Sequence, residues 1–134
     1  MVPFLSGIPE IRIVKPRPDN PVNADGDFVL YWMTMQRRPY FNYALQRAVE
    51  WAAHLNKPLL IFEALRCDYR WASDRLHRFM LQGMLDHRDY FSAHGATYYP
   101  FVESTPGQGK GLLHTLGRRA CVVVGDEFPC YFLP

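Results

Sequence analysis

The sequence predicts an α/β fold in which one parallel sheet is covered by helices on both faces. Short, continuous apolar runs alternate with longer stretches of helical periodicity, in the order strand, helix, strand, helix, strand, helix, strand. The apolar runs show no polar alternation, which is typical of parallel strands buried on both faces. With 134 residues, 49% of them hydrophobic and 21% charged, the composition is that of one globular domain. We therefore expect a Rossmann-like, doubly wound sheet in a three-layer α/β/α arrangement.

The first strand, Asp27 to Met33, is the expected centre of this sheet. Its residues from Phe28 to Trp32 are all aromatic, β-branched or large and apolar, and Asp25-Gly26 before it marks a turn. A run of this length is too short for a buried helix and too continuous for a half-exposed strand. It predicts a central strand, with Trp32 as core packing.

The remaining elements follow at short intervals. Asn56 ends the first helix, and Ser73 and Gly95 bound the second. Pro100 places the third strand at an edge of the sheet, or marks a bulge, because proline cannot donate to a ladder. In order, the expected elements are a helix over 40–55, a strand over 59–62, a helix over 73–95, a strand over 97–102, a helix over 110–118 and a strand over 121–124.

The two ends of the chain differ from this regular alternation. Residues 1–26 are rich in proline and form an extended leader, in which Ile11 to Val14 adds a short edge strand or belongs to a docked arm. The last residues, 131–134, are mostly large and apolar. We expect residues 27–134 to be the front part of a longer protein, interrupted after the fourth or fifth strand of its sheet.

A ligand site is expected beyond the carboxyl ends of the strands. In doubly wound sheets, ligands bind where the strand order reverses, which here lies between the first and fourth strands. The loops at this point run from Met33 to Arg38 and from Gly125 to Phe128. Carboxylates follow three strands, as Glu63, Glu103 and Asp126. These side chains either orient a ligand or cap loops and helix starts.

Other motifs favour structural interpretations. The glycine-rich segment from Gly107 to Gly111 lacks the first glycine and the Ser or Thr of a phosphate-binding loop, so we interpret it as a flexible turn. His77, His87 and His94 lie on one helix at steps that do not converge on a metal, and no metal site is expected. Three cysteines without a CxxC spacing indicate a reduced, intracellular setting. The net charge of +2 is too small to indicate a polyanion partner.

Three blocks of sequence resemble the photolyase and cryptochrome superfamily. They are Val29-Leu30-Tyr31-Trp32-Met33 with the following Gln-Arg-Arg loop and Asn42-Tyr43-Ala44-Leu45, then Arg78 to Met84, and then Val122 to Pro129. Together they are most similar to the N-terminal α/β domain of class II cyclobutane pyrimidine dimer photolyases. The third block departs from the family pattern because Glu127 separates its Asp from its Phe. The match covers about residues 27–130, in order and with sensible spacing.

The resemblance implies a light-dependent DNA repair enzyme that splits pyrimidine dimers with FAD. The FAD would lie in a C-terminal helical domain that this chain does not contain, so that domain and DNA are the expected partners, in a cytoplasmic protein without a membrane segment. This chain would be inactive alone and retain no cofactor. It would supply an interdomain surface and a pocket for a folate or deazaflavin antenna. The residues expected to line that pocket are Met33, Met35, Gln36, Arg37, Glu63, Glu103, Asp126 and Phe128.

Three alternatives remain open at this point. A light-signalling cryptochrome is not distinguished from a repair enzyme, because the deciding residues would lie in the helical domain. A free-standing nucleotide-binding α/β module would bind ATP or AMP at the switch point, although a glycine fingerprint after the first strand is missing. A non-catalytic interaction domain is indicated only by the apolar end of the chain.

Overall fold

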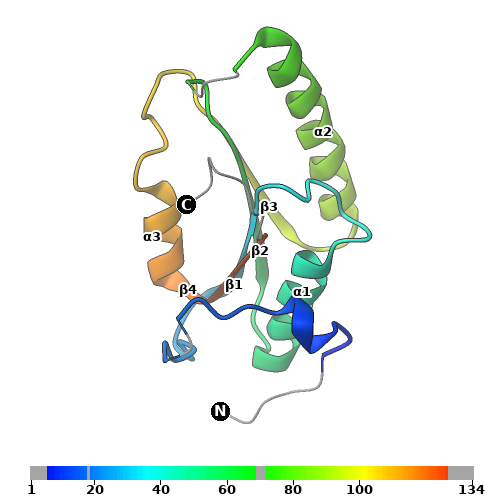
Figure 1. Ribbon diagram of the computed structural model, residues 1–134, viewed down its shortest axis with the longest axis vertical. Helices are drawn as coiled ribbons and strands as arrows, with labels where there is room; N and C mark the ends of the chain where they lie inside the picture. Colours follow the sequence, from blue (N-terminus) through cyan, green and yellow to red (C-terminus); the bar gives the residue numbers. More distant parts are fainter. Residues whose placement is uncertain (1–5, 18, 69–71, 127–134) are drawn as a thin grey trace.

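Four parallel strands form a single sheet in the computed structural model, which describes residues 6–17, 19–68 and 72–126 (Figure 1). The strands lie in the order β3-β2-β1-β4, and β1 pairs with both β2 and β4. This confirms the parallel α/β fold, the central place of the first strand and the edge position of the third. The strands are β1 (Phe28–Met33), β2 (Leu59–Leu65), β3 (Thr97–Val102) and β4 (Ala120–Gly125), and the helices are α1 (Tyr43–Leu55), α2 (Asp74–Ala93) and α3 (Leu112–Arg119).

The helices cover both faces of the sheet, as expected for three layers. Figure 1 shows α1 and α2 on one side of the strands and α3 on the other. On the first face, Val29, Tyr31 and Met33 of β1 pack with Leu45 of α1 and Phe91 of α2. On the second face, the core consists of residues from all four strands and α3, among them Leu30, Leu60, Phe62, Phe101, Ala120, Leu113 and Leu116. Alternate side chains of β1 therefore pack in two separate cores, one on each face of the sheet.

Polar side chains fix the helix boundaries. Asn42 and Ser73 accept hydrogen bonds from backbone amides in the first turns of α1 and α2, and Asn56 ends α1 in the left-handed conformation. The first helix begins three residues later than the sequence predicted, at Tyr43. The cause lies in the loop before it, because Phe41 has a φ of +52° and cannot belong to a helix.

Only the second half of α2 belongs to the core. Met84, His87 and Phe91 are buried, whereas Leu76 and Phe79 near the start of the helix are exposed. The first turns of α2 therefore contribute little to the core. The helix α2 packs on β2 and β3, and its first turns lie beyond the part of the sheet that it contacts (Figure 1).

Two local expectations are also wrong. Residues Glu10–Arg12 form a short 3₁₀ helix, so Ile11 to Val14 do not add a strand; Ile11 and Val14 are exposed and contribute no sheet face. Trp32 is 37% exposed, although it lies in the central strand, because the described residues leave its face of the sheet uncovered beyond the start of α3. Trp32 therefore borders a cavity instead of filling the core.

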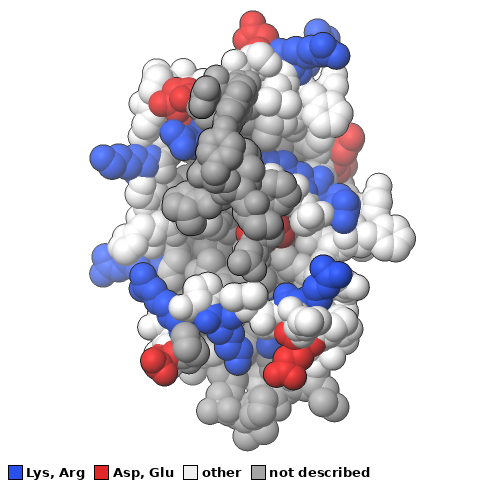
Figure 2. Space-filling model, viewed as in Figure 1, with Lys and Arg blue, Asp and Glu red and all other residues white. Residues whose placement is uncertain are grey.

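The described part of the chain shows no helix that is long and apolar enough to cross a membrane. On the face drawn in Figure 2, Lys and Arg side chains are more prominent than Asp and Glu among the described residues, and several of them gather across its lower part. This agrees with the net charge of +2.

Candidate functional site

The loop after β1 is tied to the end of β4 by one carboxylate. Asp126 accepts hydrogen bonds at Oδ2 from the backbone amides of Thr34, Met35 and Gln36, at 3.1, 3.0 and 3.1 Å. Its Oδ1 accepts a hydrogen bond of 3.3 Å from the hydroxyl of Tyr31. Burial, and next the charge of Asp126, raise the pKa of Tyr31, so this hydroxyl stays protonated and donates. Asp126 thus organises the loop at the switch point.

A second carboxylate, Glu63 on β2, is the centre of a buried polar network. It is 1% exposed and accepts hydrogen bonds from Arg37 Nη1 at 3.0 Å and from Tyr98 at 2.5 Å, and it contacts His87 Nδ1 at 2.8 Å. Burial alone would raise the pKa of Glu63. The hydrogen bonds from His87 and Tyr98, with the charges of His87 and Arg37, outweigh it and lower the pKa. Glu63 is therefore an anion that joins the arginine loop, α2 and β3.

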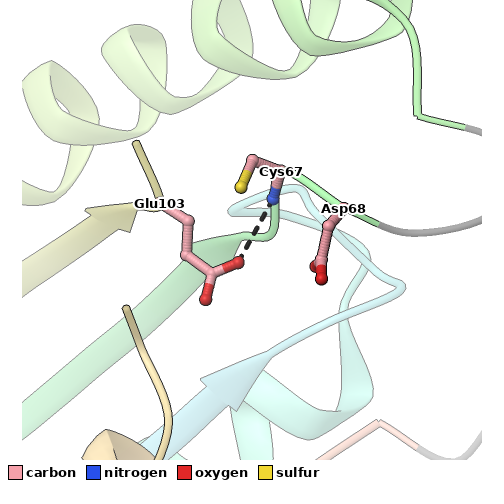
Figure 3. A group of neighbouring side chains, drawn as sticks. All are labelled: Cys67, Asp68 and Glu103. Carbon is pink, nitrogen blue, oxygen red and sulfur yellow. Dashed lines mark hydrogen bonds between the residues drawn. The ribbon is translucent and has the colours of Figure 1, made fainter. Parts of the chain in front are cut away.

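The third carboxylate, Glu103, lies just beyond β3 and holds two loops. Its Oε1 accepts from the amide of Cys67 at 3.2 Å and its Oε2 from the amide of Gly109 at 3.0 Å. Figure 3 shows the carboxylate facing the Cys67 backbone, with Asp68 beside it. The interaction with Gly109 fixes the glycine-rich segment, whose interpretation as a turn is supported by the backbone hydrogen bonds within residues 105–112.

The side chains drawn in Figure 3 are also a group of metal-ligand type. The potential ligand atoms of Cys67, Asp68 and Glu103 lie within 4.8 Å of one another. Both oxygens of Glu103 already accept backbone hydrogen bonds, however. Burial, and next the charges of Glu103 and Asp68, raise the pKa of Cys67, which disfavours the thiolate that binds metals. We therefore assign these three groups to loop structure.

A cavity of about 350 Å³ opens beside Glu103, on the α3 face of the sheet at the carboxyl ends of the strands. Its apolar walls come from three strands and from α3, and its polar groups come from the loops after β2 and β3. The volume lies in the range of small-ligand sites, and the position is where doubly wound sheets bind ligands. The lining includes Trp32, Phe62, Phe101, Leu113, Arg66 and Lys110.

A second hollow, of about 710 Å³, lies outside the sheet over residues 39–50. It is formed by the loop before α1 and by the outer side of that helix, where Tyr40, Phe41 and Tyr43 are exposed. It contains none of the carboxylates that follow the strands. We therefore take the cavity beside Trp32 as the candidate ligand site.

The structure brings together few of the residues that the sequence placed in one pocket. Glu103 lines the cavity beside Trp32, whereas Met33 is fully buried in the opposite core. Arg37 and Glu63 bind each other, and Asp126 holds the loop that carries Met35 and Gln36. Phe128 lies outside the described residues, as do the end of the third resemblance block and residues 131–134.

Sequence reasoning missed three residues that shape this region. His87 was interpreted as an ordinary helix-face histidine, but it lies against Glu63; its place on the stripe with Phe91 and Met84 was the available signal. Tyr98 alternates with exposed neighbours on β3, which indicates an inward side chain. Asn42 caps α1 and also donates to Tyr31 at 2.8 Å, a contact between positions that no spacing rule connects.

No protein-family model matches the chain. A deoxyribodipyrimidine photo-lyase from Methanothermobacter thermautotrophicus is 37% identical over 81 residues, which are 60% of this chain. The chain is related to the photolyases. It spans about 18% of the length of that photolyase. This similarity supports the resemblance seen in the three blocks. The parallel sheet of the chain is also the fold that the resemblance implied.

Proposed function

We propose that this chain is the N-terminal α/β domain of a light-dependent DNA photolyase, of the type that splits cyclobutane pyrimidine dimers. The observation that carries the proposal is the 37% identity to a photolyase over 81 residues. In this proposal residues 27–134 form the domain and residues 1–26 its leader. The reaction itself belongs to FAD in a helical domain, which is the partner of this chain and binds DNA.

The role of this chain is to hold an antenna chromophore and to present a surface to the helical domain. The cavity beside Trp32 supports the first role, because it is lined by aromatic rings and has Arg66 and Lys110 at its edge. A planar folate or deazaflavin would stack on Trp32, which is the more exposed ring, and place its acidic groups at those cations. Relative to the pocket expected from the sequence, this places the chromophore on the α3 face, away from Met33 and Asp126.

Titration of the purified chain with a reduced folate and with a deazaflavin tests this role. Because Trp32 borders the cavity, a bound chromophore is expected to quench its fluorescence. Trp32→Phe should lose most of the quenching, whereas Trp51→Phe, on the opposite face of the sheet, should keep it. Ala64→Leu adds three carbon atoms to the cavity wall and should weaken binding. Quenching that survives Trp32→Phe and Ala64→Leu unchanged would place the chromophore elsewhere.

Repair activity is tested separately. The chain alone, illuminated with a dimer-containing oligonucleotide, is expected to bind no flavin and repair nothing, and to support repair only when joined to a helical FAD domain. The reading frame that follows codon 134 in the gene is the direct check for such a domain. Flavin absorbance together with dimer splitting by the isolated chain would contradict the division of roles.

A further inference from the structure

The loop after β1 forms a small concave site made of backbone amides. Thr34, Met35 and Gln36 are consecutive, and their three N–H groups converge on a single point, which Oδ2 of Asp126 occupies. The hydroxyl of Thr34 lies 3.5 Å from the same oxygen. Successive backbone N–H groups arranged in this way are an anion-binding concavity, as found around phosphates. The geometry belongs to the backbone, so it does not depend on which anion fills it.

The position of this concavity is the one at which doubly wound sheets take phosphate groups. It lies between the ends of β1 and β4, which are neighbours in the sheet although far apart in sequence. The cation that follows the loop, Arg37, already donates to Glu63 and to the carbonyl of Ala64. One carboxylate therefore supplies the negative charge that a ligand phosphate would supply.

We propose that residues 34–36 form a binding site for phosphate-type anions whose occupant is the chain's own Asp126. The carboxylate is delivered by the end of β4 and makes hydrogen bonds that a phosphate oxygen would otherwise make. As long as it is in place, nucleotide phosphates are excluded from the switch point. Removal of the carboxylate converts the loop into a site for inorganic phosphate. This inference does not rest on the relationship to photolyases.

The proposal also bears on the alternative that the chain is a free-standing nucleotide-binding module. A free-standing module that binds ATP or AMP at the switch point needs this concavity empty. With Asp126 in it, such a module is disfavoured, and a ligand is directed to the cavity on the α3 face instead. The competing explanation is that Asp126 simply ties a flexible loop. In that case, the loop would relax without the carboxylate and would bind no anion.

The test compares Asp126→Gly with Asp25→Gly in the 134-residue chain. Both changes remove one carboxylate, but Asp25 lies in an exposed turn. Phosphate stabilises folded proteins in general, so the control is needed at equal ionic strength in chloride. We expect phosphate to raise the melting temperature of Asp126→Gly well beyond its effect on the control, with binding about tenfold tighter or more. The amide resonances of residues 34–36 should shift during the titration.

The unchanged protein supplies a second measurement. Neither inorganic phosphate nor AMP should shift the amide resonances of residues 34–36, because these amides already donate to the carboxylate of Asp126. If Asp126→Gly does not fold in chloride, refolding in phosphate becomes the readout, and recovery in phosphate alone supports the proposal. The proposal is overturned if the unchanged protein binds phosphate at these amides, if folded Asp126→Gly responds like Asp25→Gly, or if phosphate restores no folding.

Discussion

Replacement of Glu63 by Gln tests whether the buried network is held by charge or only by shape. Glutamine has the size of glutamate, so packing around the side chain is preserved. One terminal oxygen becomes an NH₂ group, which cannot accept the hydrogen bond that Arg37 donates at 3.0 Å. The hydrogen bonds from Tyr98 and His87 then meet a neutral amide oxygen instead of a carboxylate. Every interaction of this side chain is therefore weakened or lost at once.

The expected loss follows from the burial of the network. Removal of one partner of a buried ion pair costs about 3–5 kcal/mol. The lower end applies here, because Arg37 is partly exposed and keeps hydrogen bonds to the carbonyls of Thr34 and Ala64. We therefore expect Glu63→Gln to lower the free energy of unfolding by about 3 kcal/mol at pH 7. For a domain of this size, that corresponds to a fall of about 10 °C in melting temperature.

The pH dependence of the free energy of unfolding tests the role of the Glu63 charge in a second way. The pKa of Glu63 is lowered in the folded protein, so its contribution to stability is fully present above the unfolded value of about 4.3 and is lost as the pH falls through the folded pKa. The difference between the unchanged protein and Glu63→Gln should therefore shrink below that pH. A role that depended on shape alone would give no difference at any pH, because glutamine preserves the shape of the side chain.

Urea unfolding at pH 7 and at several acidic values, followed by circular dichroism, measures both effects. Glu10→Gln is the matched control, because Glu10 is exposed on the short 3₁₀ helix and should change stability by less than about 0.5 kcal/mol. An unfolding free energy for Glu63→Gln within the error of the control would refute the reasoning. So would a difference that stays constant down to the acid transition.

Five other substitutions test three separate features of the fold by the same unfolding measurement. Gly26→Ala places a Cβ 2.5 Å from a backbone nitrogen of β4 and should cost several kcal/mol, whereas Gly83→Ala, with open space around it in α2, should gain about 0.5–1 kcal/mol. Asn42→Ala removes the cap of α1 and three further hydrogen bonds and should cost more than Ser73→Ala, which removes a cap alone at about 1 kcal/mol. Phe41→Gly relieves a φ of +52° at a side chain that is 90% exposed and should stabilise the chain by about 1 kcal/mol. The opposite sign at any of these positions would contradict the corresponding assignment.

The sequence was sufficient for the fold because the signals were local. Continuous apolar strands, the caps at Ser73 and Asn56 and the proline in β3 each report on their own segment, and the rules of parallel sheets convert that list into a strand order. The burial of Trp32 was predicted wrongly, because the burial of a side chain depends on which other elements pack over it. Trp32 belongs to the central strand, yet no spacing rule reveals that α3 stops short of its side chain.

The candidate site was less accessible to sequence reasoning, for a physical reason. The carboxyl ends of the four strands could be predicted to meet at one edge of the sheet, because all the strands are parallel. The pairing of groups across that edge depends on side-chain direction, and Glu63 and Glu103 leave opposite faces of neighbouring strands. One is consequently enclosed by α2 while the other meets the cavity. A list of residues near the carboxyl ends cannot distinguish these two outcomes.

Pro100 determines on which side this sheet can grow. The amide of Glu103 donates to the carbonyl of Leu65 on β2, and amides alternate in direction along a strand. The nitrogen of Pro100, three residues earlier, therefore points away from β2, to the outer side of β3. The proline costs the sheet no internal hydrogen bond, yet it interrupts the row of donors that an added strand would need. A strand that joins this sheet, from the same polypeptide or from a second molecule, would accordingly be expected beside β4.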